Sequence, residues 1–406
     1  MFASLTVPFT GGAAEWTAEP SIKLRREYND NLRLSIFPQK SVNGSIITPA
    51  LDLGVAGPVW KIGFGVEATQ RRYSGQEGLD RDDNLLRLSS LYKTERSTWQ
   101  LSASHTNDSV ITSEIADSDT GTVQTARDRK TDTISPSWLW MYSERTQLQL
   151  AYQQTDVAYG ENTLSVGLYD YRYRTFSATL SNQLSERNQV FITGGYSEYH
   201  VPFSDFDSET RNFQAGVTTS FTESTKGTLQ AGQRQTRSVT KANSIGCESY
   251  YSNPDHSVTC VNPFIVTQDI HNESTGLVFT GSLETKTESA DWNFSLSRSL
   301  VPSGSGGQVE QDQFRLGFNK RLSPRMGVNI NGSALKSRTE EGNISSSDRT
   351  FYDFGPGAYW QWTREWSVGA NYRYAHVKRE FESEAADSHS VNLALTYHPL
   401  KMAISR

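Results

Sequence analysis

The sequence predicts an all-β protein: a transmembrane up-and-down antiparallel β-barrel of about 18 strands, with about 16 as the next alternative. Three observations support this prediction. Runs of about ten residues alternate between apolar and polar side chains. The connections between these runs are alternately short turns and long polar segments. Aromatic residues gather where the runs meet the short turns.

The alternation is clearest in one predicted hairpin. Phe314, Leu316 and Phe318 alternate with polar or small residues, and Val328 and Ile330 do the same after the turn. This is the pattern of a hairpin with one apolar and one polar face. In a soluble sandwich the apolar face packs on a second sheet, whereas in a membrane barrel it contacts lipid and the polar face lines a lumen. Alternation alone leaves both open.

The composition narrows the choice. Only 35% of the 406 residues are hydrophobic, yet 11% are aromatic. Soluble globular chains are closer to half apolar, and disordered chains are poor in aromatics. The sequence contains no apolar run long enough for a transmembrane helix. The net charge of -6, without a basic patch interleaved with aromatics, argues against a nucleic-acid partner.

The turns and loops fall into two groups. Short turns rich in Ser, Glu and Arg recur, as at 143–145, 185–188 and 323–325, and the polar segments between them are longer, the longest covering 239–270. Short periplasmic turns and long extracellular loops are typical of an outer-membrane barrel. An even strand number returns both termini to the periplasmic side. The predicted strands cover residues 18–28, 46–56, 58–72, 84–94, 97–107, 127–141, 146–158, 168–182, 188–200, 209–222, 226–238, 271–285, 290–301, 308–322, 326–338, 348–363, 366–380 and 388–398.

The two ends of the chain are predicted to lie outside the barrel. Residues 1–14 combine an apolar stretch with a small-residue end like a cleavage site but lack a basic start. They are therefore either the remnant of a signal peptide or a disordered start. Residues 15–398 then form a single outer-membrane barrel, and residues 399–406 form a C-terminal tail.

Charged residues occupy the polar faces of the predicted strands. A dry core would leave such charges unpaired, whereas a water-filled lumen accommodates them. The set is mainly basic, so either the lumen favours anions or half of these residues cap the strands at the rim without setting selectivity. The candidate pore-lining residues are Lys61, Glu67, Arg71, Arg87, Lys93, Arg234, Glu284, Arg315, Arg321 and Arg373.

Aromatic residues near the turns are predicted to form a girdle at the membrane interface, with cross-strand packing in a soluble sheet as the alternative. One strand departs from the pattern, because Arg172 and Arg174 are in phase with Phe176 and Leu180. That strand either projects above the membrane or contains a bulge. The predicted interface aromatics are Tyr92, Trp99, Trp138, Trp140, Trp360, Trp362, Trp366 and Tyr397.

Cys247 and Cys260 lie in the longest polar segment. In an oxidising compartment they are predicted to form a disulfide, which stabilises the loop by roughly 3 kcal/mol in the chain-entropy treatment. We expect the pinned loop to fold over the mouth of the barrel or into its lumen.

The sequence nominates no catalytic residue. Its 7 histidines show no HxxxH or HExxH spacing, and there is no CxxC, so no metal site is predicted. A Gly-rich phosphate cradle and a GxSxG elbow are also absent from the sequence. We therefore expect neither an enzyme nor a cofactor.

Residues 24–32, LRREYNDNL, resemble the Tyr-x-Asp-Asn-hydrophobic segment that opens members of the β-barrel porin type 2 family. The repeated pattern of strand, short turn and strand is similar over most of the chain as far as Tyr397. The resemblance implies a bacterial outer-membrane barrel, and many members are associated with exopolysaccharide or capsule export. The chain departs from the usual aromatic barrel end, because His398 to Arg406 follow Tyr397.

The function expected with this resemblance is export of an exopolysaccharide chain through an aqueous lumen. The expected partners are outer-membrane lipid and lipopolysaccharide, a hydrophilic solute, and a periplasmic export partner. Tyr169, Tyr171 and Tyr173 are candidates for stacking on sugar rings, unless they only pack. One alternative is a general diffusion porin for small nutrients, marked by an inward-folded loop. The other is a non-conducting scaffold, receptor or adhesin, marked by a filled bore.

Overall fold

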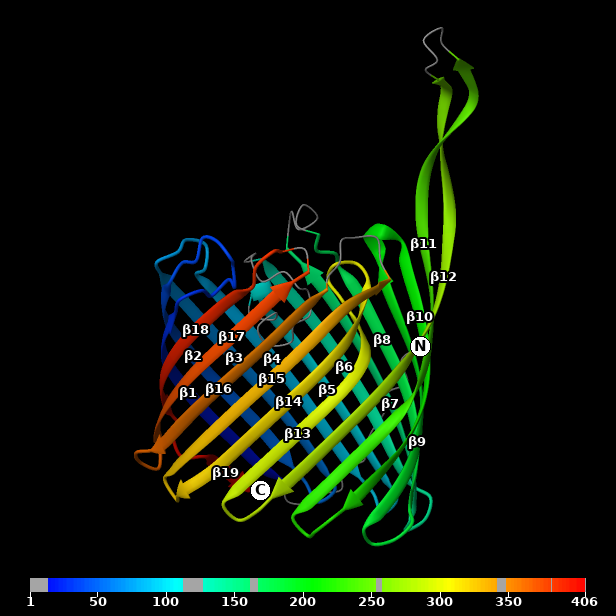
Figure 1. Ribbon diagram of the computed structural model, residues 1–406. Helices are drawn as coiled ribbons and strands as arrows, with labels where there is room; N and C mark the ends of the chain where they lie inside the picture. The colour runs from blue at the N-terminus through cyan, green and yellow to red at the C-terminus, as the bar shows by residue number, and fades with distance from the viewer. Residues whose placement is uncertain are drawn as a thin grey trace.

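The computed structural model describes residues 14–111, 127–160, 167–252, 258–341, 348–380 and 382–405. Within these ranges, eighteen antiparallel strands form a closed barrel (Figure 1). Each strand pairs with the next along the chain, and β18 closes the ring by pairing with β1. The predicted fold class is therefore confirmed. No helix among the described residues is long and apolar enough to cross a membrane.

The strands of the barrel are β1 (Glu15–Asn29), β2 (Val42–Ala56), β3 (Trp60–Ser74), β4 (Arg81–Lys93), β5 (Ser97–Ser109), β6 (Asp128–Met141), β7 (Thr146–Tyr159), β8 (Tyr171–Gln183), β9 (Asn188–Val201), β10 (Phe206–Ser220), β11 (Thr225–Ser252), β12 (Val258–Lys286), β13 (Ala290–Pro302), β14 (Gln308–Ser323), β15 (Met326–Glu341), β16 (Arg349–Gln361), β17 (Trp366–Arg379) and β18 (Ala386–Tyr397). A short 3-10 helix, η2 (Pro202–Ser204), joins β9 to β10.

The strand register separates an apolar outer face from a polar inner face. Partners across a strand pair point to the same side of the sheet. Phe64 of β3 pairs with Leu88 of β4, and both side chains are exposed. One position away, Gly65 pairs with Arg87, on the opposite face. Exposed apolar side chains on the outside and charges on the inside are the arrangement of a membrane barrel, because lipid is the outer solvent.

The predicted interface aromatics adjoin the short-turn end of the barrel. Tyr92 pairs with Trp99, whose ring stacks on Trp138 at 5.3 Å between centroids. On strands β17 and β18, the rings of Trp366 and Tyr397 lie 4.7 Å apart. Trp140 contacts the ring of Trp138, and Trp360 contacts that of Trp362. Their location at headgroup depth stays a prediction.

Strand β8 contains no bulge. Its register with β7 runs without interruption from Thr146–Asn182 to Val157–Tyr171. Arg172 and Arg174 therefore do share the outer face with Phe176, at the end near the long loops. They form ion pairs with Asp156 and Glu198 of the neighbouring strands. The structure thus excludes the bulge, and projection of this end above the membrane stays a prediction, to which the pairing of both arginines is suited.

The longest polar segment is a β-hairpin and not a loop. Strands β11 and β12 pair with each other as far as Ser252 and Val258. Pairing with β10 ends at Val239, and pairing with β13 ends at Phe279, so the upper part is a two-stranded arm that rises beyond the rim (Figure 1). The predicted disulfide is confirmed, and Cys247 and Cys260 are 5.4 Å apart between Cα atoms.

The expectation that residues 239–270 fold over the mouth or into the lumen is therefore wrong. The segment contains an apolar β-forming run at Phe264, Ile265 and Val266, and continued pairing of the two strands satisfies the backbone hydrogen bonds that an irregular loop would have to satisfy elsewhere. The arm consequently stands outside the path of a solute.

The described ends of the chain meet at the short-turn end. Residues 399–406, predicted to be a tail, include the short strand β19 (Met402–Ser405), which pairs with Glu15–Ala18 of β1. Lys401 forms an ion pair of 2.9 Å with Glu19, and this partner raises the pKa of the Lys401 ammonium. Residues 1–13, which contain nearly all of the expected signal-peptide remnant, lie outside the described residues.

Candidate solute path through the barrel

The register places every predicted pore-lining residue on the inner face. Several have acidic partners there: Arg71 donates from Nε to Asp83 at 2.6 Å, and Arg87 lies 3.6 Å from Asp52. Sequence reasoning missed these acids, although they share the alternating phase of the charged residues it selected. The residues placed on the inner face are Lys61, Glu67, Arg71, Arg87, Lys93, Arg234, Glu284, Arg315, Arg321 and Arg373.

The outer half of the lumen is narrowed by segments that fold inward from the loop end. Buried apolar residues form three clusters there. In the first, Val110 and Leu168 from connecting segments pack against inner-face residues such as Val157 and Tyr199. In the second, Leu34 packs against inner-face residues that include Phe351. A wide water-filled mouth would leave these side chains in solvent, so their burial shows that the segments occupy lumen space.

The connection between β1 and β2 is held inward by the segment that carries the family resemblance. Asn31, which is 2% exposed, donates from Nδ2 to the backbone oxygens of Ser35 and Asp387, both at 2.8 Å. Asn29 accepts from the Ser388 hydroxyl at 3.0 Å. Arg379 Nη1 donates to the backbone oxygen of Leu34 at 3.2 Å. The Asn-rich motif thus ties this loop to β17 and β18 across the seam that closes the barrel.

The tip of the β13–β14 hairpin also folds into the barrel. Tyr199 donates from its hydroxyl to the Ser303 backbone oxygen at 2.6 Å, and the Ser208 hydroxyl donates to Gln308 Oε1 at 2.7 Å. Ser303 is 1% exposed and Gln308 2%. Because Tyr199 and Ser208 lie on the inner faces of β9 and β10, the tip leaves the plane of the wall and leans across the lumen.

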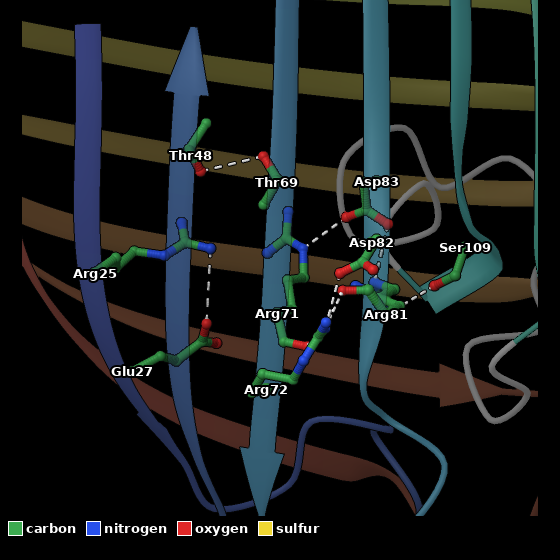
Figure 2. Close-up of polar contacts among 10 residues, drawn as sticks. All are labelled: Arg25, Glu27, Thr48, Thr69, Arg71, Arg72, Arg81, Asp82, Asp83 and Ser109. Carbon is green, nitrogen blue, oxygen red and sulfur yellow. Dashed lines mark hydrogen bonds and ion pairs between the residues drawn. The ribbon is translucent and has the colours of Figure 1, made fainter.

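A basic cavity of about 420 Å³ adjoins the β1–β2 connection, whose Leu32 and Leu34 belong to its lining. Its lining contains four arginines, Arg25, Arg71, Arg81 and Arg373, and a single acidic residue, Glu27. Figure 2 shows Arg25, Arg71 and Arg81 in a row across the inner faces of β1, β3 and β4. Sequence reasoning found Arg71 and Arg373 but missed Arg25 and Arg81, which have the same alternating phase.

Two further cavities lie on the inner wall toward the short turns. One, of about 670 Å³, is lined by charges of both signs, including Asp52, Lys61 and Arg87. The other, of about 520 Å³, is lined largely by Ser and Gln side chains such as Ser102 and Gln100. They share Lys61, Ser89 and Ser102 and are therefore adjacent. Water and hydroxylated or charged solutes can find hydrogen-bond partners along this wall.

The tyrosines considered for stacking on sugar rings are engaged in packing. Tyr171 is 5% exposed and contacts Tyr199, with 5.5 Å between the ring centroids. Tyr169 stacks on Phe203 at 5.4 Å, and Tyr173 packs against the same apolar cluster. In the described part of the chain, no group of three or more His, Cys, Asp or Glu side chains is arranged to hold a metal ion.

The class of the protein follows from the closed sheet together with its two faces. A sheet without edges, apolar outside and charged inside, is stable only with lipid around it and water within it. The protein is a bacterial outer-membrane β-barrel.

Comparisons with known proteins add no function to this barrel. No protein-family model and no curated protein match the chain. The β-barrel porin type 2 resemblance is thus not confirmed. Similar solved structures include OccK3 (OpdO) from Pseudomonas aeruginosa, with 12% identity, a TM-score of 0.42, and coverage of 95% of this chain and 96% of that chain. OccAB1 from Acinetobacter baumannii has 9% identity, a TM-score of 0.45, and coverage of 95% and 97%. The ferric-catecholate import receptor Fiu from E. coli has 10% identity, a TM-score of 0.43, and coverage of 93% and 81%.

Proposed function

We propose that the barrel is a channel through which small hydrophilic solutes diffuse across the outer membrane. The observation that carries the proposal is the inward folding of the β1–β2 connection and the β13–β14 tip. Both narrow the outer half of a lumen whose inner wall is otherwise polar. Narrowing by inward loops limits the size of a solute and leaves the hydrogen-bonding wall in contact with it.

Export of an exopolysaccharide chain is less well supported. A threading polymer needs an open bore over the whole length of the barrel, whereas Leu34, Ile111 and Ser303 are buried inside the outer half. The tyrosines that could have stacked on sugar rings are packed in an apolar cluster. We propose no periplasmic export partner, no cofactor and no catalytic activity.

The test is conductance and solute uptake by the purified full chain. In planar bilayers containing potassium chloride we expect discrete, ohmic conductance steps. Proteoliposomes should swell quickly in arabinose, more slowly in raffinose, and not in dextran of polymer size. Absence of conductance would favour a non-conducting scaffold, receptor or adhesin. Passage of dextran as fast as arabinose would restore the polymer-export function.

A further inference from the structure

We propose that the cavity bounded by Arg25, Arg71, Arg81 and Arg373 is a binding site for a small monocarboxylate with an apolar body. The inference rests on the proposed function, since it names the class of solute that the channel would select. Its evidence is the charge of the lining, the bonding of the individual guanidinium groups, and the apolar residues that share the lining.

The charged residues of the lining are mainly basic. Four guanidinium groups and one carboxylate, that of Glu27, face the cavity. Asp83 accepts from Arg71 Nε at 2.6 Å, and Asp353 accepts from Arg373 Nε at 3.3 Å. Asp83 also lies 3.2 Å from Arg81 Nε, and neither aspartate belongs to the cavity lining. The planar guanidinium presents parallel N–H donors that match a carboxylate in geometry and charge.

Arg25 is the residue whose acidic partner is least well placed. Among the described residues its ion-pair partner is Glu27, at 3.8 Å, which is beyond a hydrogen bond. Its side chain is 28% exposed and lies on the inner face beside Arg71 (Figure 2). Two neighbouring guanidinium groups repel each other, so an anion that accepts hydrogen bonds from both would relieve the repulsion and bind there.

The lining also contains buried apolar residues. Leu32, Leu34, Ile111 and Phe351 belong to its lining and are each less than one-tenth exposed. Such a surface gains from covering hydrocarbon and cannot solvate a second charged group. The volume of about 420 Å³ falls in the range of sites for small organic ligands. A single carboxylate on a compact apolar body matches both kinds of lining residue, whereas a multiply charged phosphate matches only the arginines.

Calorimetric titration of the detergent-solubilised full chain tests the site, with sodium benzoate, benzyl alcohol and inorganic phosphate as probes. We expect saturable benzoate binding, no binding of benzyl alcohol, and weaker binding of phosphate. Arg25→Gln should weaken benzoate binding about tenfold, because it removes charge-assisted hydrogen bonds. Arg25→Lys retains the charge without the planar guanidinium group, so its affinity for benzoate should lie between those of the unchanged protein and Arg25→Gln. Arg315→Gln, an inner-face change outside this cavity, should bind like the unchanged protein.

The outcomes separate this site from the proposed function. A conducting channel that does not bind benzoate, or binds it equally well after Arg25→Gln, overturns the site and leaves the channel. Equal binding of benzyl alcohol overturns the charge argument, and phosphate binding as tight as benzoate overturns the carboxylate class. Benzoate binding by a protein without conductance supports the site and overturns the channel. Heat-dependent mobility in gels checks that each variant is a folded barrel.

Discussion

Arg234 of β11 and Glu310 of β14 form an ion pair of 3.1 Å that ties the inward-folded β13–β14 tip to the barrel wall. The Arg234 side chain is 1% exposed, and that of Glu310 is 19% exposed. The pair spans β12 because Gly276 has no side chain: a Cβ there would lie 2.6 Å from Arg234 Nη2. The ion pair also depends on the end of β12–β13 pairing at Phe279. Beyond that point the β13–β14 tip leans inward, so that the face of β14 that carries Glu310 points toward the inner wall.

Replacing Glu310 by Gln should loosen the tip and raise the single-channel conductance. Glu310 also lies 3.8 Å from Arg298 and 3.9 Å from Arg338, so the change leaves several cations with less compensation. Removing one partner of a buried ion pair costs about 3–5 kcal/mol. We expect this cost to weaken the attachment of the β13–β14 tip to the wall. Planar-bilayer recording measures the effect.

Glu273→Gln is the matched control for that change. Glu273 pairs with Arg237 on the outer face, and both side chains are 60% exposed, so the pair contributes about 0–1 kcal/mol. We expect the conductance of this variant to equal that of the unchanged protein. Equal conductance of all three proteins would show that the Glu310 pair does not hold the constriction.

Gly276→Ala should reproduce the effect of Glu310→Gln. The added methyl group would displace the end of the long Arg234 side chain, and we expect the barrel itself to stay folded. Because both changes act on one contact, the double variant should conduct no more than either single variant. Gly281→Ala is the control, since its Cβ would meet Leu229 at an ordinary 3.7 Å. Additive effects of the two changes would contradict a shared contact.

Reduction of Cys247–Cys260 should affect the arm and not the channel. The disulfide joins strands that have no other neighbours at that height, and a two-stranded ribbon is marginal in water. Loss of the crosslink should cost the arm roughly 3 kcal/mol. We expect faster trypsin cleavage after Lys241 with unchanged conductance. A Cys247→Ser, Cys260→Ser variant should show the same cleavage rate with and without reductant, and a conductance change on reduction would place the arm in the solute path.

Neighbouring residues of β10 test the assignment of the two faces. Phe213 is 62% exposed on the outer face, and Gln214 lies on the inner face. Phe213→Arg should destabilise the barrel in lipid vesicles by about 2–4 kcal/mol, whereas Gln214→Arg should change stability by less than about 0.5 kcal/mol. Urea unfolding measures both. A larger loss for Gln214→Arg would reverse the assignment.

The period-two alternation of apolar and polar residues was sufficient to predict the number of strands and the two faces of the sheet. Residues such as Phe64 and Arg87 reveal their side locally, because successive side chains in a strand point to opposite faces. The same reasoning placed Arg71 and Arg373 on the inner wall. It could not choose between a bulge and a projecting strand in β8, because that choice depends on Asp156 and Glu198 of other strands.

The sequence by itself determined that this chain is an outer-membrane barrel with a charged interior, since alternation, composition and turn length are local properties. Only the tertiary structure decided where the connecting segments go. Asn31 reaches Asp387, and Arg234 reaches Glu310, across sequence separations that carry no periodic signal. The inward loops, the outward arm and the arginine cavity follow from contacts of this kind, which form only when the sheet closes.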